Sequence, residues 1–166
     1  RSENFPVRVV HNDTKLNNVL LHKNSGEGMC VVDLDTVMPG CALHDFGDLV
    51  RTAACSALED EVDLDKVRFQ PEVFGAIVEG YLESAGDMLE QSEIDHLALA
   101  PQVITYELGL RFLADYLDGD PYFKIKRPGH NLDRARAQFK LLSSMEEHFG
   151  EMEGIVRERF SPKAFA

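Results

Sequence analysis

Polar side chains near the start of the chain have types and spacings that suit phosphoryl transfer. The segment V-V-H-N-D-T-K-L-N-N contains His11, Asp13, Lys15 and Asn18 directly after a short apolar run. Phosphoryl transfer needs a carboxylate that orients and deprotonates the acceptor hydroxyl, oxygen ligands for magnesium, and a cation near the transferred group. Asp13 can be the base, Asn18 a magnesium ligand and Lys15 the cation. We interpret His11 as a brace of this catalytic segment rather than as a proton shuttle.

Two further carboxylates follow another apolar run. The segment M-C-V-V-D-L-D ends in Asp33 and Asp35, and carboxylate oxygens are hard ligands of the kind that magnesium prefers. Asp35 comes two residues after Asp33, so in an extended strand both side chains would point to the same side. We therefore predict a magnesium site made by Asn18 and Asp33, in which Asp35 assists or binds a second ion.

Short strands must position these groups. Residues 5–10, 18–22 and 29–34 are mostly apolar, with several β-branched side chains, and Asn24-Ser25-Gly26 supplies residues that tolerate positive φ. Two strands joined by such a turn form a hairpin, which brings the polar ends of both strands to one place. Residues 36–44 contain a Pro-Gly pair and are predicted to form a loop.

The remainder of the chain predicts helices. Apolar residues at helical spacing place them at 45–54, 71–82, 93–117 and 131–145. Asp45 and Asn131 are the expected caps of the first and the last. The third is apolar nearly all round, which predicts a buried central helix that Pro101 kinks or splits. We expect residues 59–65 to be a solvated acidic connector and residues 151–166 to fray.

Composition bounds the class of protein. The formal net charge is −12, which argues against nucleic acid or an anionic membrane as the main partner. The cysteines lack zinc-like spacing and suit a reducing compartment, and neither a membrane span nor a signal peptide is recognisable. We therefore expect a cytoplasmic protein with one domain over residues 1–166. Its catalytic and metal segment would span residues 7–48, and its helical, substrate-binding part residues 66–150.

The two polar motifs together resemble a known family. H-N-D-T-K-L-N-N followed by V-V-D-L-D is similar to the catalytic loop and metal-binding segment of the aminoglycoside/choline kinase superfamily, whose fold is like that of protein kinases. The Asp-x-Lys-x-x-Asn spacing also matches the protein-kinase catalytic loop. The resemblance implies a mainly helical α+β fold, in which a β-hairpin catalytic segment packs on a helical bundle. It also implies ATP as co-substrate, with Mg²⁺.

Later segments resemble one branch of that superfamily. G-C-A-L-H-D-F-G-D-L-V-R, Y-E-L-G-L-R-F-L-A-D-Y-L-D-G-D-P-Y-F and K-R-P-G-H-N-L-D-R-A-R look like N-acetylhexosamine 1-kinases. By this resemblance Asp45 braces the catalytic loop. The same resemblance places sugar contacts on Asp13, Arg111 and Tyr122.

The resemblance covers only the C-terminal lobe of a kinase. Arg1 opens almost directly into the first strand, and the family's ATP-binding N-terminal lobe and the first helices of its C-terminal lobe are not recognised in this chain. We therefore expect a fragment that is inactive without the missing lobe. Such a fragment could associate with itself through the exposed lobe interface.

Other interpretations of these residues remain open. Lys15 could be a surface charge, Tyr122 a surface aromatic, and Arg111 part of an intrahelical ladder with Glu107 and Asp115. D-L-D-T at residues 33–36 also fits the nucleophile motif of haloacid-dehalogenase-type phosphatases, which require parallel strand–helix units. A third possibility is a non-catalytic binding lobe.

Overall fold

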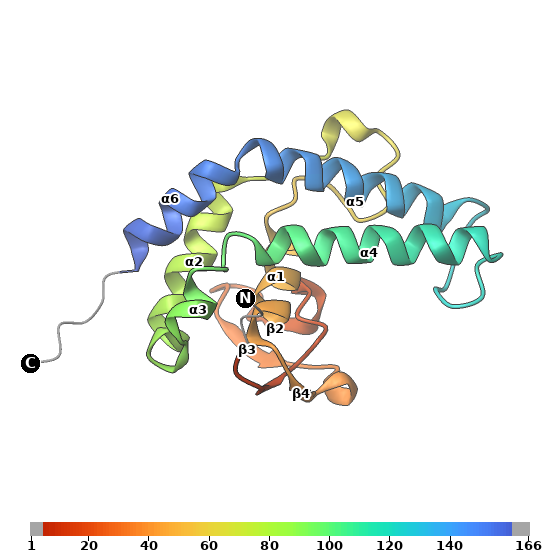
Figure 1. Ribbon diagram of the computed structural model, residues 1–166. Helices are drawn as coiled ribbons and strands as arrows, with labels where there is room; N and C mark the ends of the chain where they lie inside the picture. Colours follow the sequence, from red (N-terminus) through yellow and green to blue (C-terminus); the bar gives the residue numbers. More distant parts are fainter. Residues whose placement is uncertain (1–4, 161–166) are drawn as a thin grey trace, which may run out of the picture.

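The computed structural model describes residues 5–160 and joins a small β segment to a larger helical body (Figure 1). The strands are short: β1 Arg8–Val10, β2 Val19–Leu21, β3 Gly28–Val31 and β4 Met38–Gly40. β2 pairs with β3 and β1 with β4, and both pairs are antiparallel. The expected mainly helical α+β class is confirmed.

The predicted hairpin is confirmed, but the predicted loop over residues 36–44 is wrong. Asp33 is followed by a 3₁₀ turn, η2 Leu34–Thr36, and then by β4, in which Met38 pairs with Val10. The backbone groups of β1 need hydrogen-bond partners, and β4 provides them. Pro39 is tolerated because β4 is an edge strand.

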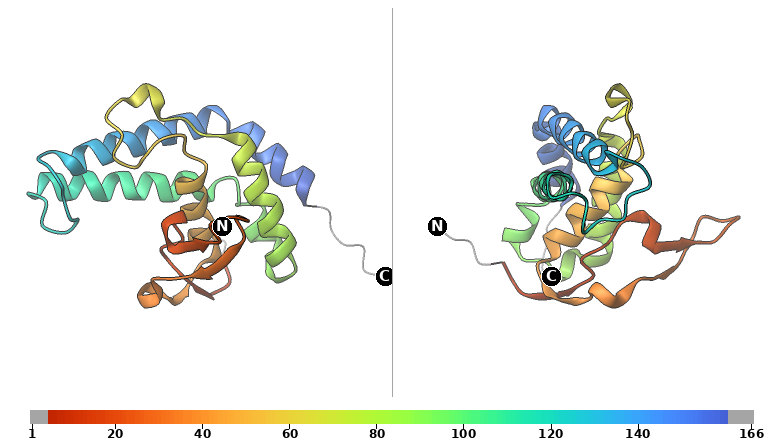
Figure 2. Two further views of the ribbon diagram at one scale, coloured as in Figure 1. Left: turned by 180° about the vertical axis from the view of Figure 1, so that it is seen from behind. Right: turned by 90° about the vertical axis from the view of Figure 1, so that its right-hand side faces the viewer.

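Helices make up the body. They are α1 Ala42–Ala53, α2 Pro71–Ala85, α3 Gln91–Ile94, α4 Ala100–Leu117, α5 His130–Glu147 and α6 Phe149–Arg159, with 3₁₀ turns η1 Leu16–Asn18, η3 Leu64–Lys66 and η4 Gly86–Met88. α4 and α5 lie side by side above the β segment (Figures 1 and 2). Pro71 occupies the first turn of α2, where its missing N–H is harmless.

Both predicted caps are wrong. α1 starts at Ala42, so Asp45 lies inside its first turn and its carboxylate is used elsewhere. α5 starts at His130 after Gly129, whose φ of +74° favours glycine. Asn131 is therefore inside the helix, fully buried, and its amide bonds to neighbouring carboxylates.

α4 is not buried on all sides. Pro101 sits in its first turn, so the proline splits the predicted long helix and does not kink it. One face packs on α1 and α5, where Gly109 lets the backbone approach Phe139 so closely that a Cβ would lie 2.9 Å from the ring. The opposite face is exposed and apolar, with Val103 48% and Tyr106 50% accessible.

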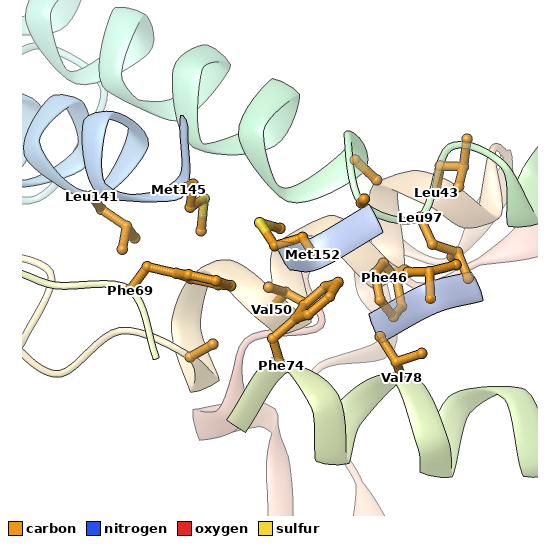
Figure 3. Packing of buried hydrophobic residues seen from close by; sticks show 14 of the residues in the cluster. Leu43, Phe46, Val50, Phe69, Phe74, Val78, Leu97, Leu141, Met145 and Met152 are labelled. Carbon is orange, nitrogen blue, oxygen red and sulfur yellow. The ribbon is translucent and has the colours of Figure 1, made fainter. Parts of the chain in front are cut away.

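The core lies where α1, α2, α5 and α6 meet. Phe46, Phe74 and Met145 are fully buried there, and Met152 of α6 inserts between them (Figure 3). The predicted fraying of residues 151–166 is therefore wrong as far as residue 160, because α6 buries apolar side chains against α2. The remaining residues of that range lie outside the described part.

The acidic connector is less solvated than expected. Glu59 accepts a hydrogen bond from the buried Arg51 (Nη1 to Oε1, 2.9 Å), and Asp60 contacts His130 (Nε2 to Oδ2, 2.9 Å). Burial, the largest single effect, would raise the pKa of Asp60. The hydrogen bond and charge of His130, together with smaller contributions from the backbone and Lys126, outweigh it and lower the pKa. Within residues 5–160, no helix is long and apolar enough to cross a membrane.

Candidate active site

Asp45 holds the catalytic loop from the first turn of α1. Its Oδ2 accepts the backbone N–H of His11 and its Oδ1 that of Asn12, both at 2.7 Å. Asn12 has a φ of +62°. This backbone conformation costs energy and persists where neighbouring contacts impose it. Thr14 adds a third link by donating to the backbone carbonyl of Asp45 at 2.5 Å. The loop is thus fixed to the helical body by charge-assisted bonds.

His11 connects the loop to the second polar segment. Its Nε2 donates to the carbonyl of Val32 at 3.1 Å, and its own carbonyl accepts from the Thr36 hydroxyl at 2.6 Å. Asn12 adds a bond from Nδ2 to the carbonyl of Thr36. These contacts fit the bracing role that the sequence suggested for His11, and they join the two motifs into one site.

Asp13 lies at the centre of the loop. Its Oδ2 accepts from Lys15 Nζ at 2.6 Å and from Asn18 Nδ2 at 2.8 Å. Asn18 also donates to the backbone carbonyl of Asp13 at 2.8 Å. The Asp13 side chain is 27% exposed. The carboxylate is therefore oriented by two donors while part of it stays open to a ligand.

The backbone suits the predicted metal-binding roles of Asn18 and Asp33, but it does not support the argument made for Asp35. The N–H of Val32 bonds the carbonyl of Asn18 at 2.9 Å, so Asp33 follows directly after the residue paired with Asn18. Asp33 has a φ of +66°, a strained value of the kind that clusters at functional sites. Asp35 lies in the 3₁₀ turn η2 and not in a strand. The extended-strand argument that placed it beside Asp33 therefore fails.

The donor set fits a magnesium ion. The nitrogen of the Asn18 amide makes both hydrogen bonds to Asp13, which leaves its oxygen as the atom that could ligate a metal. Asp33 and Asp35 are exposed carboxylates. No group of three or more His, Cys, Asp or Glu side chains within residues 5–160 converges as a metal site. The Asn18 amide and the Asp33 carboxylate would supply oxygen ligands, which magnesium prefers when phosphates supply the others.

A cavity of about 350 Å³ brings separated parts of the chain together beside the loop. Asp13 and Lys15 line it together with Arg111 and Tyr122, which come much later in the chain. The lining also includes residues that were not predicted from the sequence, among them His44, Asp48, Glu107 and Phe123.

Arg111 is not part of a two-sided ladder. Its Nη1 is 4.0 Å from Glu107, whereas Asp115 bonds to backbone N–H groups of the following loop. The guanidinium carbon lies 5.4 Å from the ring centre of Phe123 and 5.9 Å from that of Tyr122. Arg111 therefore stacks on aromatic rings at the wall of the cavity.

A buried polar network that borders the cavity was also not predicted. Arg51 is 5% exposed and donates to Asp48, Glu59 and Gln138 at 2.8–3.1 Å. Burial alone would lower the pKa of Arg51, but the two carboxylates outweigh it and raise the pKa. The i,i+3 spacing of Asp48 and Arg51 was the one available signal. Arg51 and Lys15 also border a second cavity, of about 590 Å³.

Comparison with protein families found a match to the N-terminal half of the chain. The model of the phosphotransferase enzyme family, APH, matches residues 1–83. The match contains the catalytic loop, the Asp33 segment and Asp45, and it ends before Arg111 and Tyr122, so it supports no particular branch. The match is consistent with a kinase-like fold, and the chain belongs to the phosphotransferase enzyme family.

Proposed function

We propose that this chain is the acceptor-binding part of a kinase that transfers a phosphoryl group from ATP to a small-molecule alcohol. The favoured acceptor is the anomeric hydroxyl of an N-acetylhexosamine, such as GlcNAc or GalNAc. One observation carries the proposal: Asp13, held by Lys15 and Asn18, lines a cavity that Arg111 and Tyr122 also line.

The chemistry follows from the positions of these side chains. Asp13 acts as a general base and accepts the proton of the acceptor hydroxyl as its oxygen attacks the γ-phosphorus of ATP. The bond from that phosphorus to the β–γ bridging oxygen breaks, and ADP leaves. Lys15 is a cation within hydrogen-bond distance of that carboxylate and would offset charge that develops on the transferred group. Asn18 and Asp33 would hold Mg²⁺, with Asp35 as an assisting ligand. When bound, the ion would neutralise charge on the phosphates.

The cavity suits a sugar in size and chemistry. Its volume of about 350 Å³ is at the small end of ligand sites. The carboxylates of Asp13 and Glu107 can accept hydrogen bonds from sugar hydroxyls. The guanidinium of Arg111 can donate a hydrogen bond to a carbonyl, such as that of an N-acetyl group. The rings of Tyr122 and Phe123 provide an apolar surface for a sugar face.

An ATP-binding lobe would cover exposed apolar side chains of the β segment. Val9 is 80%, Met29 64%, Leu34 61% and Leu20 50% exposed. Several exposed apolar side chains in one segment suit an interaction site. We propose that the missing N-terminal lobe docks here, and that the isolated chain is inactive and can associate with itself through the same surface.

Phosphorus NMR would test the activity. The natural protein that contains this chain would receive magnesium and ATP, with GlcNAc, GalNAc, choline and an aminoglycoside as acceptors. Asp13→Asn removes the base, and Asp65→Asn, on the exposed connector, is the matched control. A sugar 1-phosphate signal that only Asp13→Asn abolishes supports the proposal. ADP and phosphate without a phosphorylated acceptor would refute the sugar substrate.

Two alternatives have weaker support. A haloacid-dehalogenase-type phosphatase would use Asp33 as nucleophile, but the strands described here pair antiparallel and that fold needs parallel ones. Release of phosphate from a phosphomonoester without ATP would favour it. A non-catalytic lobe would consume no ATP in any form of the protein.

A further inference from the structure

Asp115 anchors the loop that carries Tyr122 and Phe123, two of the residues that line the cavity. We name residues 118–129, which join α4 to α5, the aromatic loop. Asp115 is 7% exposed; its Oδ1 accepts the N–H of Tyr122 at 2.8 Å and its Oδ2 accepts the N–H of Phe123 at 2.9 Å. One carboxylate therefore fixes the backbone of both aromatic residues.

A third donor completes the anchor. Nδ2 of Asn131, a side chain with 0% exposure, donates to Oδ2 of Asp115 at 2.9 Å and to Oδ1 of Asp120 at 2.8 Å. The carboxylate thus ties the end of α4 to the loop and to the start of α5. At the other end of the loop, the N–H of Lys126 bonds His130, so the aromatic loop is held at both ends.

Helix stability alone does not favour Asp115. The residue lies in the last turn of α4, which contains no basic side chain, and a carboxylate there faces the negative end of the helix dipole. Burial of the charge adds a second cost. The hydrogen bonds to the aromatic loop offset the costs of the helix dipole and of burial. The presence of a carboxylate at position 115 is therefore best explained by its bonds to the aromatic loop.

The held residues line the same cavity as Asp13. Tyr122, Phe123 and Arg111 all border it, and Arg111 stacks on both rings. We propose that Asp115 is a positioning residue that sets acceptor affinity through Tyr122 and Phe123. This inference rests on the proposed function, because it assumes that the cavity takes the acceptor.

The first test measures the anchor and the binding in the same sample. Amide exchange of Tyr122 and Phe123 is followed by NMR, and GlcNAc and GalNAc are then titrated. Asp115→Asn, which replaces one acceptor oxygen with a donor, should abolish protection of one or both amides and weaken sugar binding about tenfold. Asp118→Asn removes the same charge from an exposed position three residues later and should change neither.

A double-mutant cycle separates positioning from general stability. Tyr122→Ala alone should weaken sugar binding about tenfold. In the Asp115→Asn background it should weaken binding by less than about twofold further, because both changes affect the same contact between the aromatic loop and the sugar. Full additivity of the two effects overturns the inference, as does unchanged sugar affinity in Asp115→Asn. Both results leave the proposed function standing. If the unmodified protein binds neither sugar, the proposed acceptor fails and the inference fails with it.

Discussion

The β segment, residues 5–40, and the helical body, residues 42–160, differ in what covers their apolar side chains. In the body, Phe46, Phe74 and Leu141 are almost inaccessible. Among the described residues before Ala42, Val10 is the buried apolar side chain, whereas Val9 and Met29 face solvent. Yet the β segment carries the candidate base, and its conformation depends on polar bonds to α1 and α3.

The candidate base and the hydrophobic core therefore lie in separate parts of the molecule. Hydrophobic burial stabilises the body, and a small number of hydrogen-bonded carboxylates fix the catalytic segment onto it. Substitutions can therefore change one property without the other, except at the residues that join the two regions. The predictions below test that separation, from the largest expected effect to the smallest.

Asp13→Asn should lower kcat by about 10²–10⁴-fold, the range for loss of a general base. The amide keeps the size of the side chain and its bond from Asn18, so the unfolding midpoint should stay within a degree or two. Steady-state assays of the natural protein and thermal melts measure the two quantities. Full activity in this variant would remove Asp13 from the base role.

Phe74→Ala should destabilise the protein by about 3–5 kcal/mol, since it empties a fully buried site in the core. Leu20→Ala is the matched change in the β segment, where the side chain is 50% exposed, and should cost less than about 0.5 kcal/mol. Urea denaturation gives both values. Equal losses would show that the hairpin is part of the same core.

The sequence was sufficient where a local pattern determines the structure. The turn at Asn24-Ser25-Gly26 and the β-branched residues around it predicted the hairpin, and β2 and β3 form there. Pro71 predicted the start of α2 for a similar reason, because its fixed φ suits a first helical turn. Arg111 and Tyr122 required the family resemblance, since neither has a distinctive local signal.

The predictions that failed concern residues whose conformation or bonding depends on tertiary contacts. Asp45 has the chemistry of a helix cap, but backbone donors from a loop more than thirty residues earlier take its carboxylate. Asp35 was placed by assuming an extended strand, and the chain turns at Asp33 instead. Asp115 looked like a member of a helix ladder, and the loop that it holds could not be seen in the sequence.

Arg8→Met should cost about 3 kcal/mol, because it leaves the buried carboxylate of Glu93 without its partner. Arg8 donates to both oxygens of Glu93 at 2.7–2.8 Å and joins β1 to α3. This bond outweighs burial and lowers the pKa of Glu93 below its ordinary value of 4.5.

The pH dependence of this pair has a definite sign. A lowered folded-state pKa gives stability that is present above the ordinary value and is lost as the pH falls through the folded-state value. The free energy of unfolding should therefore drop on acidification below about pH 4.5. In Arg8→Met that drop should disappear or reverse. An identical acid dependence in both proteins would contradict the assignment to Glu93.

Asp45→Asn should affect both regions modestly, because this carboxylate is the joint between them. The amide retains one acceptor oxygen, so one of the two N–H bonds at 2.7 Å is lost and the other becomes weaker. We expect a loss of about 1–2 kcal/mol in stability and a fall in kcat of about tenfold, since a loosened loop misplaces Asp13. Urea denaturation and steady-state assays on the same preparation measure the free energy of unfolding and kcat. Asp48→Asn, in the buried network, is the comparison variant and should change stability more than activity. An unchanged kcat in Asp45→Asn, together with the loss of stability, would mean that the catalytic loop keeps its shape without this bond to α1.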